Sequence, residues 1–409
     1  MLEGKPFWWL VSEPVPIKSR ARTNRAVERD SEVLDAALVE VRTLGLDLLG
    51  MHGVARRAGI TAGAVYSRHE TVGELMVALW EHRCGAVTRE LVAGILIAAR
   101  GGPAPDLSGI VSSNDPALIV GVEMIAVCHR YPELAEVVVP ELVATIGWER
   151  QDSLTQSRFA YLFALTVGAL MHNTVEPVDP NHWRSIFGLV VAAIGTDGVE
   201  VDGSWSPRLG HAIHSVTGEP LRDALINAAC SVIGEVGLNV ATNSRISRRA
   251  GLTPGAVYTL YDSKDELLVD AMRVLLNDAV ADNESLTASA GDRDHMAEAS
   301  AHLMSRGAGD ARRPWLRFRL EVYIAAMHRR DLAAVLEEVH ASGRLRYEQL
   351  LSGTTLPRST VHLIALVGQS MPLGLSVLDR YIDRLELIDH RVVTVPLLGS
   401  VASLARSGT

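Results

Sequence analysis

The sequence predicts an all-α fold, and three observations lead to that prediction. Apolar residues recur at helical spacing through most of the 409 residues. Clear alternation of apolar and polar residues, which is typical of half-buried β-strands, is missing. Apolar residues make up 48% of the chain and charged residues 21%, so the helices can bury a sizeable core.

The first predicted helix covers Ser31–Leu44. Val33, Ala37 and Val41 share one of its faces, and Ser31 is the expected N-cap. The later helical patterns are, in order, Glu74–Ala98, Leu154–Met171, Trp183–Ile194, Leu221–Val236, Asp265–Val280, Trp315–His328, Leu332–Leu351 and Leu356–Ser376. The composition changes at Ala99–Asn114 and again at Asp282–Asp294, which we expect to be breaks between helices.

One peptide occurs twice in nearly the same form. RRAGITAGAVY spans Arg56–Tyr66 and RRAGLTPGAVY spans Arg248–Tyr258, 192 residues later, with two differences in eleven positions. The similarity extends to flanking residues at the same offset. Weaker matches follow at offsets of 199 and 200, the latter pairing Gly168 with Gly368. A tandem duplication with copies near 200 residues is therefore the predicted organisation, since this period is far too long for a solenoid repeat.

The repeat divides the chain into five predicted parts. They are a first head (residues 26–75), a first body (76–196), a linker (197–219), a second head (220–267) and a second body (268–409). The linker is assigned because its stretch is rich in Gly, Ser, Asp and Pro and lacks sustained periodicity.

Each repeated peptide has the pattern of a helix-turn-helix. In the second head Thr242 is expected to cap a short helix, and Gly251 ends it because glycine tolerates the left-handed conformation of a tight turn. Thr253 is then expected to cap a second helix with Pro254 in its first turn. Such a helix N-terminus carries free N–H groups and a partial positive charge, which suit phosphate. The windows Gly237–Tyr261 and Gly45–His69 carry net charges of +3 and +2 on a chain of net charge −9.

At these residues the sequence resembles the tetracycline-repressor-like (TetR) family of transcriptional regulators. AGLTPGAVY…SKDEL and AGITAGAVY…TVGEL carry the resemblance over about fifty residues of each copy. The resemblance implies a three-helix DNA-binding head joined to a helical body for ligand binding and dimerisation. Carried over position by position, it implies the following DNA-contacting residues: Arg56, Thr61, Ala62, Gly63, Tyr66, Ser67, Arg68, Arg248, Thr253, Pro254, Gly255, Tyr258, Thr259 and Lys264. Tyr261 takes the place of a core aromatic, and for Tyr66 and Tyr258 a half-buried core role stays open.

The first copy departs from this pattern in ways that predict weaker DNA binding. Val72 stands where the second copy has Lys264, Gly50 replaces the capping Thr, and His69 replaces the core aromatic. One lost lysine–phosphate contact lowers the salt slope of binding by about 0.9. A basic arm precedes the first head and would either contact DNA or remain a solvated tail; its cations are Lys18, Arg20, Arg22 and Arg25. We expect the second head to contribute more of the DNA binding.

Motifs for enzymatic chemistry are missing, so we expect no catalytic residue, no cofactor and no metal site. GxSxG, HExxH, a P-loop and a strand-associated GxGxxG do not occur. Cys84, Cys128 and Cys230 are far apart and are expected to be buried thiols in a reducing cytoplasm. The N-terminus lacks the features of a signal peptide, and the apolar stretches fall below the roughly 18 residues that span a membrane, so a soluble protein is expected.

The predicted function is sequence-specific transcriptional regulation. The expected partners are a double-stranded DNA operator and a small apolar or amphipathic effector. Repression released by that effector is the mode that the resemblance implies. One chain with two heads would form an intramolecular pseudo-dimer, although a homodimer with four heads stays open. The alternative function is a helical binding or scaffold protein whose DNA-binding heads have decayed.

Overall fold

The computed structural model describes residues 24–196, 201, 204–287, 293–352 and 356–407. Within these ranges the chain folds into α-helices joined by short turns, with no β-strand, so the all-α prediction is confirmed. Up to residue 196 the helices are α1 (Asn24–Leu44), α2 (Met51–Arg57), α3 (Ala62–Tyr66), α4 (Val72–Leu79), α5 (Gly85–Ala99), α6 (Leu107–Ser112), α7 (Pro116–Val127), α8 (Pro132–Ile146), α9 (Ser153–Val175) and α10 (Pro180–Ile194). After the linker they are α11 (Pro220–Val236), α12 (Asn243–Arg249), α13 (Lys264–Thr287), α14 (Arg293–Arg306), α15 (Arg313–Ala326), α16 (Arg330–Leu350), α17 (Arg358–Leu378) and α18 (Arg391–Ser407).

Local sequence explains where many of these helices begin. Asp115 and Asp179 cap α7 and α10 through their side chains, and a proline follows each at the first helical position. Thr242 caps α12 by accepting a hydrogen bond from the N–H of Arg245, as predicted. Asp152 caps α9 in the same way through the N–H of Thr155. These side chains satisfy N–H groups that the helix itself leaves without partners.

Three predicted boundaries are wrong. Ser31 does not cap α1, because the helix already begins at Asn24; instead the Ser31 hydroxyl accepts a hydrogen bond from Arg83 at 2.6 Å. The segment 99–114, expected as a break, contains α6, and α13 continues through Thr287 into the second expected break. Before the last helix, Arg384 adopts a left-handed φ of 59° that interrupts the helical path, and α18 begins at Arg391.

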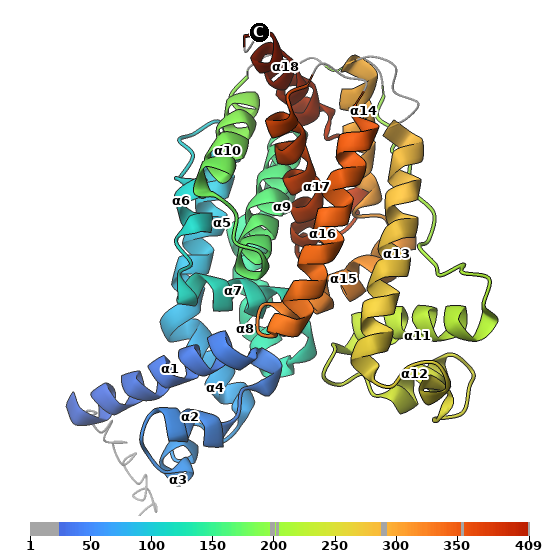
Figure 1. The fold of residues 1–409 in the computed structure, drawn as a ribbon. Coiled ribbons are helices and arrows are strands. Elements are labelled where there is room, and N and C mark those ends of the chain that lie inside the picture. Colours follow the sequence, from blue (N-terminus) through green and yellow to red (C-terminus); the bar gives the residue numbers. More distant parts are fainter. Residues whose placement is uncertain (1–23, 197–200, 202–203, 288–292, 353–355, 408–409) are drawn as a thin grey trace, which may run out of the picture.

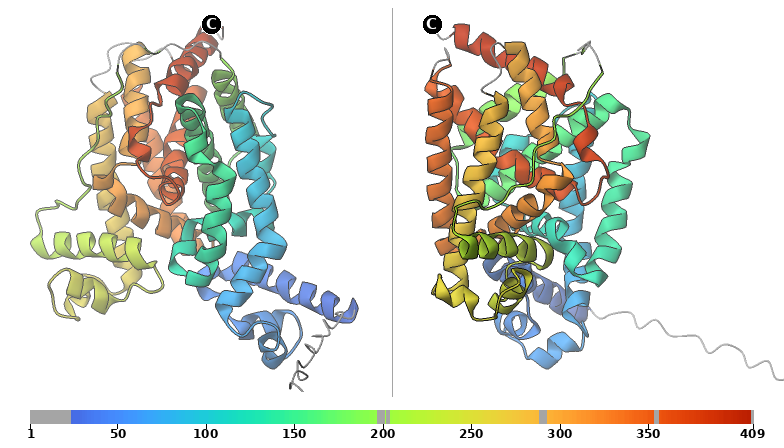
Figure 2. Two further views of the ribbon diagram at one scale, coloured as in Figure 1. Left: turned by 180° about the vertical axis from the view of Figure 1, so that it is seen from behind. Right: turned by 90° about the vertical axis from the view of Figure 1, so that its right-hand side faces the viewer.

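The two heads lie at one end of the molecule, and α18 lies at the other (Figure 1). Views from behind and from the side show the long body helices running between these two ends (Figure 2). The described part of the linker crosses the second body and packs on it. There Trp205 stacks on His302 with ring centroids 4.7 Å apart, and Ile213 is buried. The linker therefore has a fixed course along much of its described length.

The centre of the molecule is a bundle in which α9 packs along α17 and α10 packs against α18. Two glycines allow the close crossing of α9 and α17. A Cβ atom on Gly168 would overlap the carbonyl oxygen of Ser370, and one on Gly374 would overlap the carbonyl oxygen of Ala164. Both atoms belong to backbone that cannot turn aside as a side chain would, so larger residues at these positions would force the helices apart.

The expectation that every apolar stretch is too short to span a membrane is wrong for α17. Among the described helices it alone is long and apolar enough to cross a membrane by composition, although 67% of its apolar window is buried inside the protein. Its contacts with α9, α15 and α16 account for that apolar character as core packing. All three cysteines are free and buried, as predicted.

Candidate nucleic-acid interface

In the first head, α2 and α3 form a complete helix-turn-helix. Gly59 adopts φ 67° in the turn between them, a conformation that favours glycine. The side chain of Thr61 accepts a hydrogen bond from the N–H of Ala64 at 3.3 Å and so caps α3. Val65 is buried and fixes the inner face of α3 against the head. The opposite face of α3 is left towards solvent.

The second head has the same turn but a different second element. Gly251 adopts φ 72°, which confirms the predicted turn. The predicted α-helix capped by Thr253 is wrong, because the chain forms only a 3₁₀ turn at Ala256–Thr259. In that turn the N–H of Tyr258 donates to the carbonyl of Gly255, three residues back. The recognition segment of the second head is therefore shorter and less regular than α3.

One aligned position gives a physical reason for this difference. Arg68 follows α3, and its Nε donates to Asp30 on α1 at 2.7 Å while its Nη1 donates to the carbonyl of Ala64. These bonds fasten the end of α3 to the head. Leu260 occupies the equivalent place in the second head, is 41% exposed, and has no polar group to make such bonds. The second segment thus lacks the side chain that holds α3 in place.

Both tyrosines expose a large part of their side chains, and Tyr258 exposes more than Tyr66. Tyr66 is 46% exposed, with its ring packed edge-on against His52, and Tyr258 is 63% exposed. A phenol hydroxyl at such a position can donate to a phosphate oxygen. The arrangement suits contact with a nucleic-acid backbone from either head.

The basic charge of the two heads is partly neutralised within the protein. Arg57 forms an ion pair with Glu40 at 2.8 Å, and Arg249 forms one with Glu235 at 2.7 Å. Arg56 and Arg248, which are equivalent in the repeat, are exposed, and no ion pair of either is seen among the described residues. These two arginines are the repeated cations most open to phosphate.

Lys264 does not extend into solvent as the sequence prediction required. Its Nζ donates to the carbonyls of Leu238 and Ala241 at 2.8 and 3.1 Å, and burial lowers its pKa. Phosphate contact by Lys264 would need these bonds to break. Tyr261 packs as expected: it is buried, and its hydroxyl donates to Asp270 at 2.7 Å.

The remaining predicted contact residues divide by exposure. Exposed ones are Thr61, Gly63, Ser67, Thr253, Pro254, Gly255 and Thr259, whereas Ala62 is half-buried. Of the proposed basic arm, Lys18, Arg20 and Arg22 lie outside the described residues. Arg25 falls in α1, and its side chain is not among those described.

Two buried glutamates lie at the interface between the halves, and one of them also contacts a head. Glu123 on α7 accepts hydrogen bonds from the N–H of Leu46 at 2.7 Å and from His328 of the other half at 2.9 Å. Glu321 on α15 pairs with Arg130 of the other half at 3.2 Å. Burial raises the pKa of Glu321 to about 7, against the opposing effect of Arg130. The contacts of Glu123 thus join the backbone beside one head to the interface between the halves.

A cavity lies in the second body, between α13, α14, α15, α16 and α17. It holds about 800 Å³ of space free of protein atoms, part of it open to solvent. Most of its walls are apolar, from residues such as Leu276, Trp315 and Val339, and polar groups include Arg319, Tyr323, His340 and Gln369. This mixture of apolar walls and a few polar groups is typical of sites for small organic molecules.

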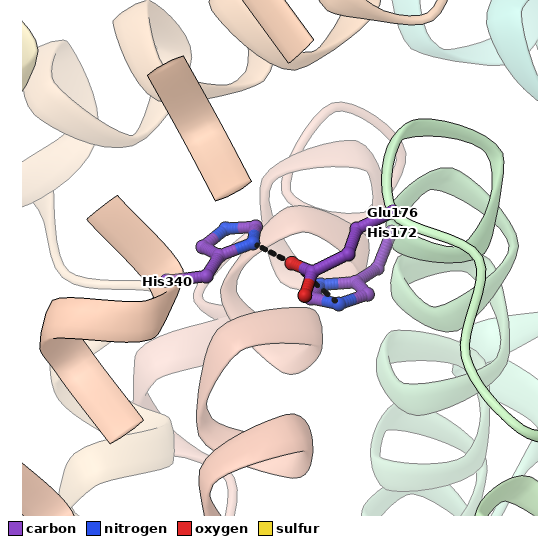
Figure 3. A group of neighbouring side chains, drawn as sticks. All are labelled: His172, Glu176 and His340. Atoms are coloured by element: carbon purple, nitrogen blue, oxygen red, sulfur yellow. Dashed lines mark hydrogen bonds and ion pairs between the residues drawn. The ribbon is translucent and has the colours of Figure 1, made fainter. Parts of the chain in front are cut away.

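Two histidines and a carboxylate meet beside this cavity (Figure 3). Glu176, directly after the end of α9, accepts from Nδ1 of His340 at 2.7 Å and from Arg344 at 3.0 Å, and His340 in turn bonds Tyr323. His172 is buried with neither ring nitrogen hydrogen-bonded, and burial lowers its pKa to about 3. These residue types can hold a metal ion. The carboxylate, however, is already engaged by an arginine and a histidine.

Sequence reasoning missed this group because its members come from distant helices. His172 and Glu176 stand four residues apart in the sequence, a spacing typical of neighbours on one helix face, and this could have drawn attention although α9 ends at Val175. His340 joins them only through the packing of α16 beside α9. The cavity was likewise not readable, since its walls come from five helices.

The second head also matches a known protein family. Residues 225–271 match the family model described as "Bacterial regulatory proteins, tetR family". This segment is a tetR-type helix-turn-helix domain. The match begins in α11 and ends in α13, so it contains the second head's helix-turn-helix.

Among the curated proteins that this chain resembles are several named "HTH-type transcriptional regulator BetI". The protein of that name from Stenotrophomonas maltophilia is 37% identical over 120 residues, which cover 28% of this chain and 59% of the relative. "BetI 2" from Chromohalobacter salexigens is 34% identical over 117 residues, or 27% of this chain and 55% of the relative. The protein from Rhizobium meliloti is 43% identical over 68 residues, or 15% and 34%. The chain thus spans little more than half the length of the first two relatives.

Proposed function

We propose that this protein is a DNA-binding transcriptional regulator that presents two helix-turn-helix heads from one chain. The observation that carries the proposal is the second head, which matches the tetR-type domain and exposes Arg248 and Tyr258. The first head supports it independently, because its α3 is capped, held in place and exposed on its outer face. Both heads lie at the same end of the molecule, as simultaneous binding to one DNA duplex requires (Figure 1).

The two halves are proposed to act as an intramolecular pseudo-dimer. Contacts across a two-fold axis must be reciprocal. The close contacts Gly168–Ser370 and Ala164–Gly374 meet this condition if Gly168 is equivalent to Gly374 and Ala164 to Ser370. That equivalence needs an offset of 206 between the copies here, rather than the 200 suggested by Gly168 and Gly368. The pairs Arg130–Glu321 and His328–Glu123 are reciprocal at an offset of 198. An association of this kind would leave no need for a second chain, so the protein is expected to be a monomer in light scattering.

Because the heads differ, the preferred operator is proposed to be asymmetric. A gel shift with the DNA upstream of its own gene, over a range of salt concentrations, tests DNA binding directly. A shift that unrelated DNA of equal length does not compete is the expected result. If no sequence-preferring shift occurs at any salt concentration, the regulator proposal fails, and the alternative of a helical scaffold protein takes its place.

Control by a small molecule is proposed to act through the second body. Its cavity supports this, because α13 forms part of the wall and also carries Tyr261's partner Asp270 beside the second head. A ligand that changes the position of α13 would move this head relative to the first and change the spacing presented to DNA. Release of DNA on ligand binding, and hence repression, is the proposed direction. A cytoplasmic location follows from the proposed function.

A further inference from the structure

A buried cation in the cavity wall lacks a carboxylate partner. Arg319 on α15 is 7% exposed, and its Nη2 donates to the carbonyl oxygen of Gln369 at 2.6 Å. Its guanidinium also lies over the ring of Tyr323, 5.5 Å from the centroid. A carbonyl dipole and an aromatic face stabilise a cation only in part, and a buried charge without a counter-ion is costly.

The other arginines around the cavity are each matched by a carboxylate. Arg312 pairs with Asp282, Arg346 pairs with Glu284 at 3.1 Å, and Arg344 pairs with Glu176 at 3.0 Å. For Arg319 no ion pair is seen within the described ranges. Asp282 also pairs with Arg306, so the ionic groups of this region carry an excess of positive charge, and Arg319 is a cation without a carboxylate partner that lines the cavity.

The nearby histidines do not change this balance. Burial lowers the pKa of His172 and of His340, so both are neutral near pH 7, and Glu176 is already engaged by Arg344 and His340. A divalent cation held by His172, Glu176 and His340 would add to an existing excess of positive charge. The charges of this region favour an anion instead.

We propose that the cavity binds an amphiphilic monoanion, a carboxylate with an apolar tail, and that the carboxylate pairs with Arg319. Leu276, Trp315 and Val339 supply apolar walls for the tail. An arginine and a carboxylate can form two parallel hydrogen bonds, which fixes the head of the ligand. As a statement about the effector this rests on the proposed function, whereas the binding itself requires no DNA.

The test is isothermal titration of the full chain with decanoate, decanol and decyltrimethylammonium, which share a tail and differ in head-group charge. Decanoate is expected to bind with one site per chain and about tenfold to a hundredfold more tightly than decanol, the range of a charge-assisted hydrogen bond. The ammonium compound is expected not to bind. Equal affinity for decanoate and decanol, tighter binding of the ammonium compound, or no binding of decanoate would each overturn the proposal.

Arg319→Met separates a ligand-binding role from a structural one. We expect it to lose the preference for decanoate over decanol while the melting temperature of the ligand-free protein stays level or rises, because an unpaired buried charge is removed. Arg317→Met is the matched control, on the same helix and with the same charge loss, at a residue outside this cavity wall. It should keep the preference. Preserved preference in Arg319→Met, or its loss in Arg317→Met, contradicts the assignment.

The two proposals fail in distinguishable ways. If decanoate binds as expected and no DNA fragment is shifted, the cavity assignment stands and the regulator proposal fails. If DNA is bound and no carboxylate amphiphile enters the protein, the regulator proposal stands and the cavity assignment is wrong.

Discussion

The two heads carry nearly the same eleven-residue peptide, yet the peptide folds differently in each. In the first head it ends in the capped helix α3, and in the second it ends in a single 3₁₀ turn. The sequence differences within it, Ile60 for Leu252 and Ala62 for Pro254, do not disfavour a helix in the second copy. The sequence difference that affects the structure lies just after the peptide, where the first head has Arg68 and the second has Leu260.

The comparison teaches that a recognition helix of this length depends on tertiary bonds. A helix of five residues is far too short to be stable alone in water. In the first head, the side chains of Arg68 and Thr61 add hydrogen bonds to the backbone hydrogen bonds within α3. We infer that the first head is ready to bind DNA, whereas the second must order its recognition segment on binding and loses affinity for that reason.

The largest effect is expected from breaking the frame that both heads share. Gly374→Leu would push a side chain into the backbone of Ala164. We expect the free energy of unfolding to fall by about 3 kcal/mol and binding by both heads to weaken together. Gly188→Ala on α10 is the control, because no atom lies within 4 Å of its added Cβ; it should stabilise the protein by about 0.5–1 kcal/mol. Urea unfolding measures both. Independent heads would instead keep their separate affinities.

A second test uses the two buried glutamates at the interface between the halves. Glu123 is hydrogen-bonded through both oxygens, whereas Oε1 of Glu321 has no partner and burial raises the pKa of Glu321 from 4.5 to about 7. Between those values the folded protein holds a proton that the unfolded chain has lost, so stability falls as pH rises from 4.5 to 7. The expected contribution is up to about 3 kcal/mol.

Glu321→Gln should remove this part of the pH dependence, because the amide does not titrate. Urea unfolding of both proteins across pH 4.5 to 7 is the measurement. An unchanged slope in the variant would mean that Glu321 is ionised throughout and held by Arg130.

Arg68→Ala should make the first head resemble the second. It removes the bonds to Asp30 and to the carbonyl of Ala64, and we expect a local loss of about 1–2 kcal/mol. Hydrogen exchange of the Ser67 amide, which donates to Gly63 within α3, reports this loss directly. Arg100→Ala, which removes exposed bonds to Gln151, is a control that should leave that exchange rate unchanged. Equal protection in both variants would refute the role given to Arg68.

Substitution of the exposed tyrosine in each head compares how much the two heads contribute to DNA affinity. Tyr66→Ala and Tyr258→Ala are each expected to weaken binding about threefold to tenfold, which is the loss of one hydrogen bond to phosphate. The sequence predicts the larger loss for Tyr258. Lys264, on which that ranking depended, is bonded to main-chain carbonyls, so we expect the larger loss for Tyr66 on the preformed first head; a larger loss for Tyr258 would contradict this. Fluorescence anisotropy with labelled operator DNA measures both.

The smallest effect is expected at the caps. Thr61→Ala removes the side chain that caps α3 and should cost about 1 kcal/mol of stability. Thr253→Ala removes the equivalent side chain, which makes no capping bond in the second head, and should stay within about 0.5 kcal/mol. Thermal unfolding of the two variants compares them. Equal losses would indicate that Thr253 caps a helix in solution.

The elements that sequence could predict were those fixed by local chemistry. Gly251, Thr242 and the apolar spacing of α11 predicted the turn, the cap and the helix correctly. The 3₁₀ turn could not be predicted, because it follows from the lack of an anchor between helices rather than from the peptide itself. The bonds of Lys264 and the unpaired charge of Arg319 were hidden for the same reason: each depends on which distant backbone or side chain lies beside it.

The central claim is that one chain places two unequal heads on one operator. Sedimentation of the protein with a DNA fragment that carries the mapped site measures how many chains bind, and footprinting of the same complex shows where. The account predicts one chain per fragment, with two protected segments about one helical turn apart and one protected more weakly. Two chains per fragment, or a single protected segment that survives both Arg56→Ala and Tyr66→Ala without loss of affinity, would contradict it.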